Sequence, residues 1–107
     1  MGHYSYSPLR QKFTPEQVEA EIKTIVSECL PNVVPCRTEG VPISRGDDRK
    51  AHWHFMLTTW PKDCDAAFSM SLIKPGNRLK FKLPVSGDGQ EAQRALRTRL
   101  VMRLNKA

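Results

Sequence analysis

Two stretches of the chain repeat apolar residues at the spacing of a helix. In the first, the apolar positions are Val18, Ile22, Ile25, Val26 and Cys29. Thr14 and Gln17 have the spacing of a capping box, and Pro15 suits the first helical position. Because the residue before a proline avoids the helical conformation, the helix is expected to end at Leu30, before Pro31.

The second stretch lies near the C-terminus and is rich in arginine. Its apolar ridge comprises Ala92, Leu96, Leu100 and Leu104. Asp88 can cap this helix, with Glu91 completing a capping box. Arg99 and Arg103 lie close to the ridge. Either these two side chains extend along the edge of the sheet, or the helix has a second apolar side for a partner or for a homodimer.

Between these helices, three stretches alternate apolar and polar residues with the period of a strand: 51–60, 66–74 and 78–83. Their apolar face comprises Trp53, Phe55, Leu57, Phe68, Met70, Leu72, Leu79, Phe81 and Leu83. Pro75 and Gly76 predict a type II turn between the last two stretches. The three stretches therefore predict an antiparallel meander with one buried face.

The remaining segments complete the predicted fold. Residues 33–37 predict a short edge strand, residues 39–50 an exposed loop, and residues 1–13 an irregular arm. Residues 14–107 are then expected to form one α+β domain. In this domain an N-terminal and a C-terminal helix pack on one face of the meander.

The positive charge is concentrated in the second half of the chain. The formal net charge is +6, and the isoelectric point is about 9.6. Residues 1–60 contain seven Lys/Arg and seven Asp/Glu, whereas residues 61–107 contain ten and four. Such an uneven distribution favours binding to nucleic acid, to an anionic membrane or to an acidic protein.

The cysteines and the apolar runs indicate the compartment. Cys29, Cys36 and Cys64 are widely spaced and form no CxxC pair, unlike the paired cysteines of small secreted domains. No apolar run approaches the roughly 20 residues of a membrane span, and the first residues do not resemble a secretory signal. We therefore expect a cytoplasmic protein with no membrane partner.

The polar face of the predicted meander provides most of the candidate binding residues. Basic side chains alternate onto this face beside His52, His54, Ser69 and Ser71, and more follow on the last helix. The candidate nucleic-acid-binding residues are Lys74, Arg78, Lys80, Lys82, Arg94 and Arg97. A row of cations suits a phosphate backbone, whereas the predicted face has no aromatic ring to stack on bases, except Trp60 at a strand end. Alternatively, the same cations keep an edge strand from aggregating.

His52-Trp53-His54 resembles, over these three residues only, the motif of HUH endonucleases, which nick single-stranded DNA. That resemblance would imply a divalent metal on the two histidines and a tyrosine nucleophile. Residues 87–106 contain no tyrosine, however, and Tyr4 and Tyr6 precede the first helix.

A zinc site is a second alternative for the two histidines. Its ligands would be His52, His54, Cys36 and Cys64, but their spacing is unlike that of the short-loop pairs of zinc sites. We expect no metal, no other cofactor and no catalytic residues, because no nucleophile motif or phosphate-binding glycine loop is present.

The order helix, three strands, helix is similar to that of the double-stranded-RNA-binding domain. That family carries lysines at the start of its last helix, where this chain has Gly89, Gln90, Glu91 and Gln93. The sequence as a whole predicts a non-catalytic nucleic-acid-binding accessory domain that contacts the phosphate backbone. The alternative is a protein-binding regulator or inhibitor, of a kind encoded by phages or mobile elements, that docks its basic surface on an acidic partner.

Overall fold

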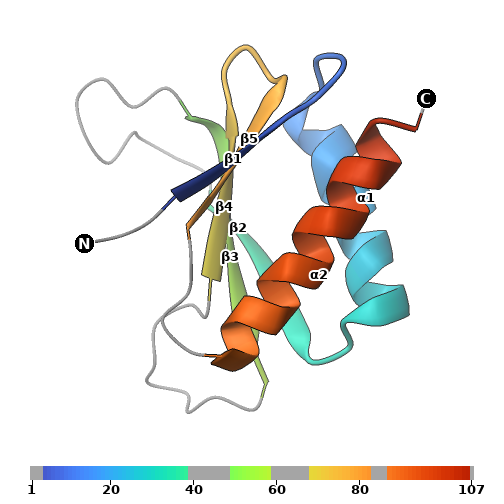
Figure 1. The fold of residues 1–107 in the computed structure, drawn as a ribbon, viewed down its shortest axis with the longest axis vertical. Coiled ribbons are helices and arrows are strands. Elements are labelled where there is room, and N and C mark those ends of the chain that lie inside the picture. Colours follow the sequence, from blue (N-terminus) through green and yellow to red (C-terminus); the bar gives the residue numbers. More distant parts are fainter. Residues whose placement is uncertain (1–3, 39–48, 59–67, 83–86, 107) are drawn as a thin grey trace.

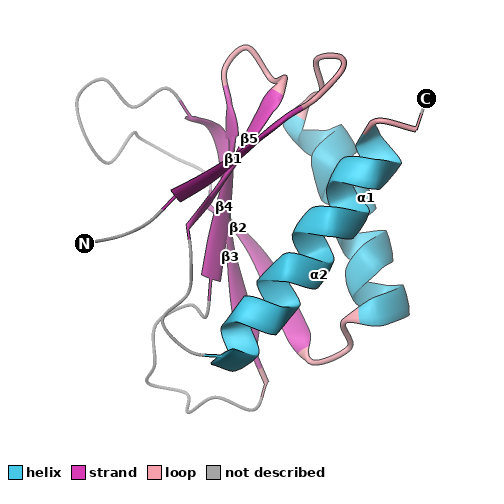
Figure 2. Ribbon diagram, viewed as in Figure 1, coloured by secondary structure: helices cyan, strands magenta, loops and turns pink. Residues whose placement is uncertain are grey.

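The computed structural model describes residues 4–38, 49–58, 68–82 and 87–106. Within these ranges the chain forms two helices and a five-stranded antiparallel sheet, so the predicted α+β class is confirmed. The elements in chain order are β1 (Tyr4–Pro8), α1 (Pro15–Cys29), β2 (Val33–Thr38), β3 (Arg49–Leu57), β4 (Phe68–Ile73), β5 (Arg78–Lys82) and α2 (Gly87–Leu104). The strand order is β1-β5-β4-β3-β2. Both helices lie on one side of the sheet (Figures 1 and 2).

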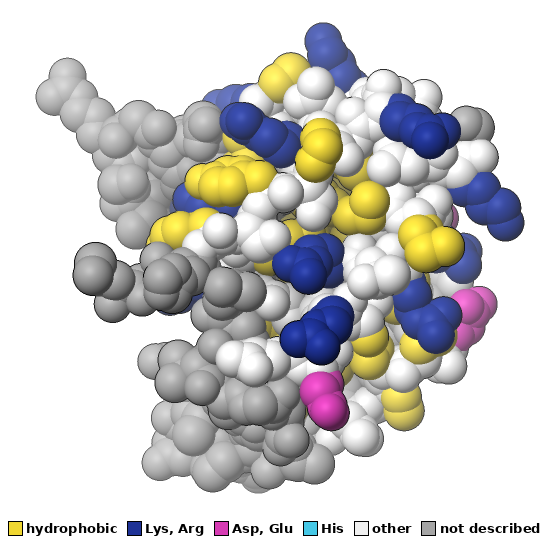
Figure 3. Space-filling model, viewed as in Figure 1, with side chains coloured by type: hydrophobic (Ala, Val, Ile, Leu, Met, Phe, Trp, Pro, Cys, Tyr) yellow, Lys and Arg dark blue, Asp and Glu magenta, His cyan; other side chains and the backbone are white. Residues whose placement is uncertain are grey.

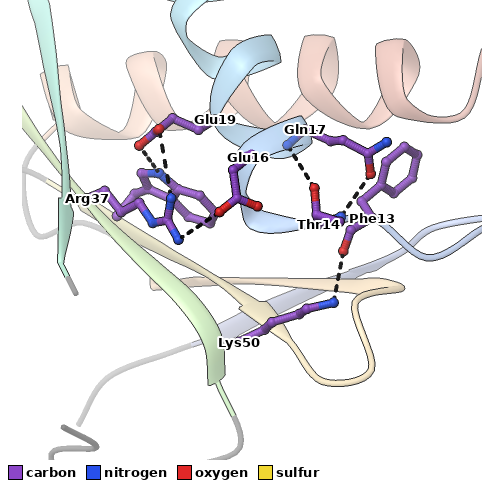
Figure 4. A network of polar contacts seen from close by, with 8 residues as sticks. Phe13, Thr14, Glu16, Gln17, Glu19, Arg37 and Lys50 are labelled. Carbon is purple, nitrogen blue, oxygen red and sulfur yellow. Dashed lines mark hydrogen bonds and ion pairs between the residues drawn. The ribbon is translucent and has the colours of Figure 1, made fainter. Parts of the chain in front are cut away.

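Helix α1 begins and ends as its sequence predicts. The Thr14 hydroxyl accepts a hydrogen bond from the Gln17 amide at 3.2 Å, and the Gln17 side chain accepts one from the Thr14 amide at 2.9 Å (Figure 4). These two bonds satisfy N–H groups that have no partner inside the helix. Cys29 is the last helical residue, and Leu30 is the C-cap. Val18, Ile22 and Ile25 point into the core.

The predicted apolar face of the three strands is confirmed in the core, although β4 is buried on both of its faces, so its polar positions are not open as predicted. One contiguous cluster joins the buried side of the sheet to the two helices. Its largest fully buried side chains are Trp53, Phe55, Phe81, Ile22, Ile25, Met70, Leu72, Leu79, Leu96, Leu100 and Val18. Leu83, which was also predicted to be buried, lies outside the described residues.

The prediction of an irregular arm over residues 1–13 is wrong for Tyr4–Pro8. This segment is strand β1, and it pairs antiparallel with β5 along its whole length. A search for apolar alternation misses such a strand, because it alternates tyrosine with serine and contributes no large side chain to the core. Its pairing comes from the backbone of β5, which lies 70 or more positions away in the sequence (Pro8 to Arg78) and cannot be detected from local patterns.

Three predicted boundaries also change. Gly76 donates its amide hydrogen to the Ile73 carbonyl at 2.7 Å, so the turn closes one residue earlier than the predicted type II turn. Residues 49 and 50, assigned to the loop, begin β3, while residues 39–48 lie outside the described ranges. Helix α2 starts at Gly87, one residue before the predicted cap.

Helix α2 packs through its predicted ridge, and its last turn is joined to α1. Ala92, Leu96, Leu100 and Leu104 are all buried. Arg103 donates a hydrogen bond to Glu21 and also faces Glu28, and the bond with Glu21 raises the pKa of Arg103. The prediction that Arg103 extends along the edge of the sheet is therefore wrong, because α1 supplies its partners. No helix of the described ranges is long and apolar enough to cross a membrane.

Candidate nucleic-acid interface

The face of the sheet that is turned away from the helices is here called the outer face. Antiparallel pairing brings outward side chains of successive strands into rows across this face. One row runs through Tyr4, Lys82, Ser69, His54 and Cys36. The next row runs through Tyr6, Lys80, Ser71 and His52. Residues far apart in the chain thus form a single surface.

The basic strand β5 lies inside the sheet, between β1 and β4. The alternative that its cations protect an edge strand is therefore wrong, because β5 has no free edge. Arg78 and Lys82 are exposed and Lys80 is half-buried. Lys74 is exposed in the turn that joins β4 to β5, so it extends the line of cations beyond Arg78.

The outer face carries two exposed aromatic side chains that the sequence interpretation missed. Tyr4 is 50% exposed and Tyr6 is 54% exposed. The Lys80 ammonium lies 4.2 Å from the centre of the Tyr4 ring and 6.0 Å from that of Tyr6, and the Arg78 guanidinium lies 5.7 Å from the centre of the Tyr6 ring. The signal was the Tyr-Ser-Tyr-Ser alternation, which places aromatic rings on one face of a strand. Trp60, the aromatic residue proposed from the sequence, lies outside the described residues.

The middle of the outer face is less accessible than the sequence predicts. Ser69 and Ser71 are buried, with exposed fractions of 9% and 4%. A nitrogen of the His52 ring lies 2.6 Å from the Ser71 hydroxyl, and the rings of His52 and His54 meet edge to face with their centres 4.5 Å apart. These polar groups form a packed cluster, so the accessible part of the outer face is centred on β1 and β5.

The described residues contain no cluster of three or more His, Cys, Asp or Glu side chains that could hold a metal ion. Cys36 lies opposite His54 in the ladder, but Cys64, the fourth residue of the zinc alternative, lies outside the described ranges. Tyr4 shares a row with His54 but is separated from it by three strand spacings, about 14 Å. The structure does not bring the histidines and a tyrosine together as the HUH resemblance would imply.

The two candidate arginines of α2 lie on the helix layer, away from the outer face. Arg94 is exposed, whereas Arg97 is half-buried and donates a hydrogen bond to the Ser5 hydroxyl at 2.9 Å. Ser5 belongs to β1, so Arg97 joins the edge strand to α2. Arg97 therefore has a structural partner, and Arg94 is the accessible member of this pair.

The described acidic residues are confined to the helices, whereas basic residues lie on both the helices and the strands. Within the described ranges every acidic residue lies on a helix: Glu16, Glu19, Glu21, Glu28, Asp88 and Glu91. The five strands contain only basic charges: Arg37, Arg49, Lys50, Arg78, Lys80 and Lys82. Figure 3, seen from the side that carries β1 and α2, shows Lys and Arg spread widely and Asp and Glu in small areas only.

Several of these helix carboxylates have partners within the fold. The Arg37 guanidinium lies 3.6 Å from Glu16 and 3.9 Å from Glu19 (Figure 4). The Trp53 ring N–H donates to Glu19 at 3.4 Å. These contacts compensate carboxylates of α1 on the helix side of the sheet, and among the described residues the charges that β5 presents on the outer face are all basic.

Comparison of the chain with protein-family models, with curated proteins and with solved structures found no match.

Proposed function

We propose that this protein is a non-catalytic nucleic-acid-binding accessory domain whose outer face contacts the phosphate backbone. The observation that carries the proposal is the line of Arg78, Lys80 and Lys82 on β5, a strand inside the sheet. Among the described residues, no carboxylate lies within ion-pair distance of these three side chains. No carboxylate of the described chain thus competes with an external anion for these cations.

The spacing of these cations supports contact with a regular polyanion. Alternate residues of a strand are about 7 Å apart, so the three side chains span about 14 Å. Binding several phosphates in line releases counterions from the nucleic acid, which gives affinity without reading the base sequence. Lys74 lengthens the line at one end, and Arg94 is a separate contact on the helix layer.

The test is a titration of fluorescently labelled DNA and RNA with the purified protein, at about 50 mM and about 200 mM salt. The variant Arg78→Ala/Lys82→Ala removes the two exposed cations of β5 and leaves Lys80 beside the tyrosines. Lys23→Ala/Lys106→Ala is the matched control, because it removes the same charge from exposed positions on α1 and beyond α2.

We expect the β5 variant to bind more weakly than the control at both salt concentrations. The slope of the logarithm of its binding constant against the logarithm of the salt concentration should become less steep by about 0.7 to 0.9 for each lost phosphate contact. Equal weakening in the two variants would mean that net charge alone acts, and the outer face would not be the site. Absence of any binding by the wild-type protein at low salt would contradict the proposal and favour the acidic protein partner.

A further inference from the structure

We propose that the bound nucleic acid is single-stranded and that two neighbouring bases stack on Tyr4 and Tyr6. This inference rests on the proposed function and adds the class of nucleic acid to it. The inference depends on strand β1, which places the side chains of Tyr4 and Tyr6 beside the basic strand β5.

The two tyrosines have the arrangement of a stacking platform. They occupy alternate positions of β1, so their side chains emerge on the same face about 7 Å apart. About half of each side chain is exposed, although aromatic side chains of this size contribute most when buried. Neither ring belongs to the core cluster. Two adjacent rings that the fold does not bury are available to the flat faces of bases.

The neighbouring cations place phosphate-binding groups beside the rings. Lys80 lies over both tyrosines and Arg78 lies over Tyr6, and both cations come from β5. Because β1 is the edge of the sheet, no further strand of the described chain lies beyond the rings on the other side. A nucleotide at this edge can therefore stack its base on a tyrosine while its phosphate meets a cation of β5.

This geometry favours single strands over duplexes. In a duplex the base faces are stacked on one another, so only phosphates and groove edges are accessible. The rings of Tyr4 and Tyr6 would contribute little to duplex binding, whereas each base stacked on an aromatic ring strengthens single-strand binding by about fivefold or more. Stacking is also tolerant of base identity, because every base has a flat aromatic face.

The experiment compares a labelled single-stranded oligonucleotide of mixed sequence with the duplex of the same length. Tyr4→Thr/Tyr6→Thr removes both rings and keeps a residue suited to a strand. Tyr4→Phe/Tyr6→Phe is the matched control, since it keeps the rings and removes only the hydroxyl groups. Circular dichroism and thermal unfolding of all three proteins establish that the fold is retained.

We expect the threonine variant, which lacks both rings, to lose at least about 25-fold in single-strand affinity, with the salt dependence unchanged. The phenylalanine variant should bind like the wild type. Duplex binding should be weaker and unaffected by either variant. Equal affinity for both nucleic acids with no effect of the threonine variant would overturn the stacking inference but leave the proposed function standing. Loss of binding in the phenylalanine variant would also overturn it, because stacking does not need the hydroxyl. Absence of wild-type binding to both nucleic acids would contradict the proposed function itself.

Discussion

Gly76 is the residue whose backbone and surroundings both require glycine. Its φ angle is +111°, in the region that side chains with a Cβ rarely adopt. A Cβ placed there would lie 2.6 Å from the Phe13 carbonyl oxygen. The Gly76 carbonyl accepts a hydrogen bond from the Phe13 amide at 2.8 Å. The Lys50 ammonium donates a hydrogen bond to the Phe13 carbonyl (Figure 4). The turn therefore holds the segment between β1 and α1 in place.

Gly76→Ala is expected to lower the free energy of unfolding by more than about 1 kcal/mol, because it combines an unfavourable φ with a backbone clash. Chemical denaturation measures this change. Asn77→Ala is the control in the same turn, because Asn77 is exposed. The hydrogen bond that Asn77 accepts from the Leu9 amide uses its backbone carbonyl and is kept in the alanine variant. An alanine variant at Gly76 as stable as the wild type would show that the turn is not held in this way.

At the scale of single elements, the start of α1 was predictable because its determinants are local. The capping residues are three positions apart, and both hydrogen bonds of the box form as predicted. Strand β1 was not predictable in the same way, because its partner strand is distant in the sequence and its own side chains are polar or exposed. The candidate site was consequently predicted only in part: its cations follow from the alternation of β5, and its tyrosines required the strand order.

Thr14→Ala should lower the free energy of unfolding by about 1 kcal/mol, because the Gln17 amide loses its partner. The measurement is the denaturation midpoint. Ser27→Ala, at an exposed position inside the same helix, is the matched control and should cost little. Identical midpoints for Thr14→Ala and the wild type would contradict the role of the cap.

The attachment of β1 to α2 can be measured as a coupling energy between Ser5 and Arg97. Their hydrogen bond of 2.9 Å is half-buried, so we expect a coupling of about 0.5 to 1.5 kcal/mol in a double-mutant cycle of Ser5→Ala and Arg97→Ala. Hydrogen exchange of the β1 amides should accelerate in both single variants, while that of the central strand β4 stays unchanged. Additive effects of the two substitutions would show that this bond does not hold the edge strand.

At the scale of the whole molecule, the charges on the described strands are all basic. The described acidic residues lie on the helices, and those of α1 pair with Arg37 and Arg103 within the fold. The outer face keeps the cations of β5 and the rings of β1. The net charge and its concentration in the second half of the chain could be predicted from the sequence. The position of the β5 cations beside the β1 rings could not, because it depends on the strand order.

The central claim is that nucleic acid binds on the outer face at β1 and β5. The most direct test is a titration of isotopically labelled protein with a single-stranded oligonucleotide at low salt, followed by amide chemical shifts in NMR spectra. We predict that the largest shifts fall on Tyr4, Tyr6 and residues 78–82, while the buried core positions Ile22 and Ile25 of α1 hardly change. Shifts confined to the helices, or no shifts at all, would contradict the claim.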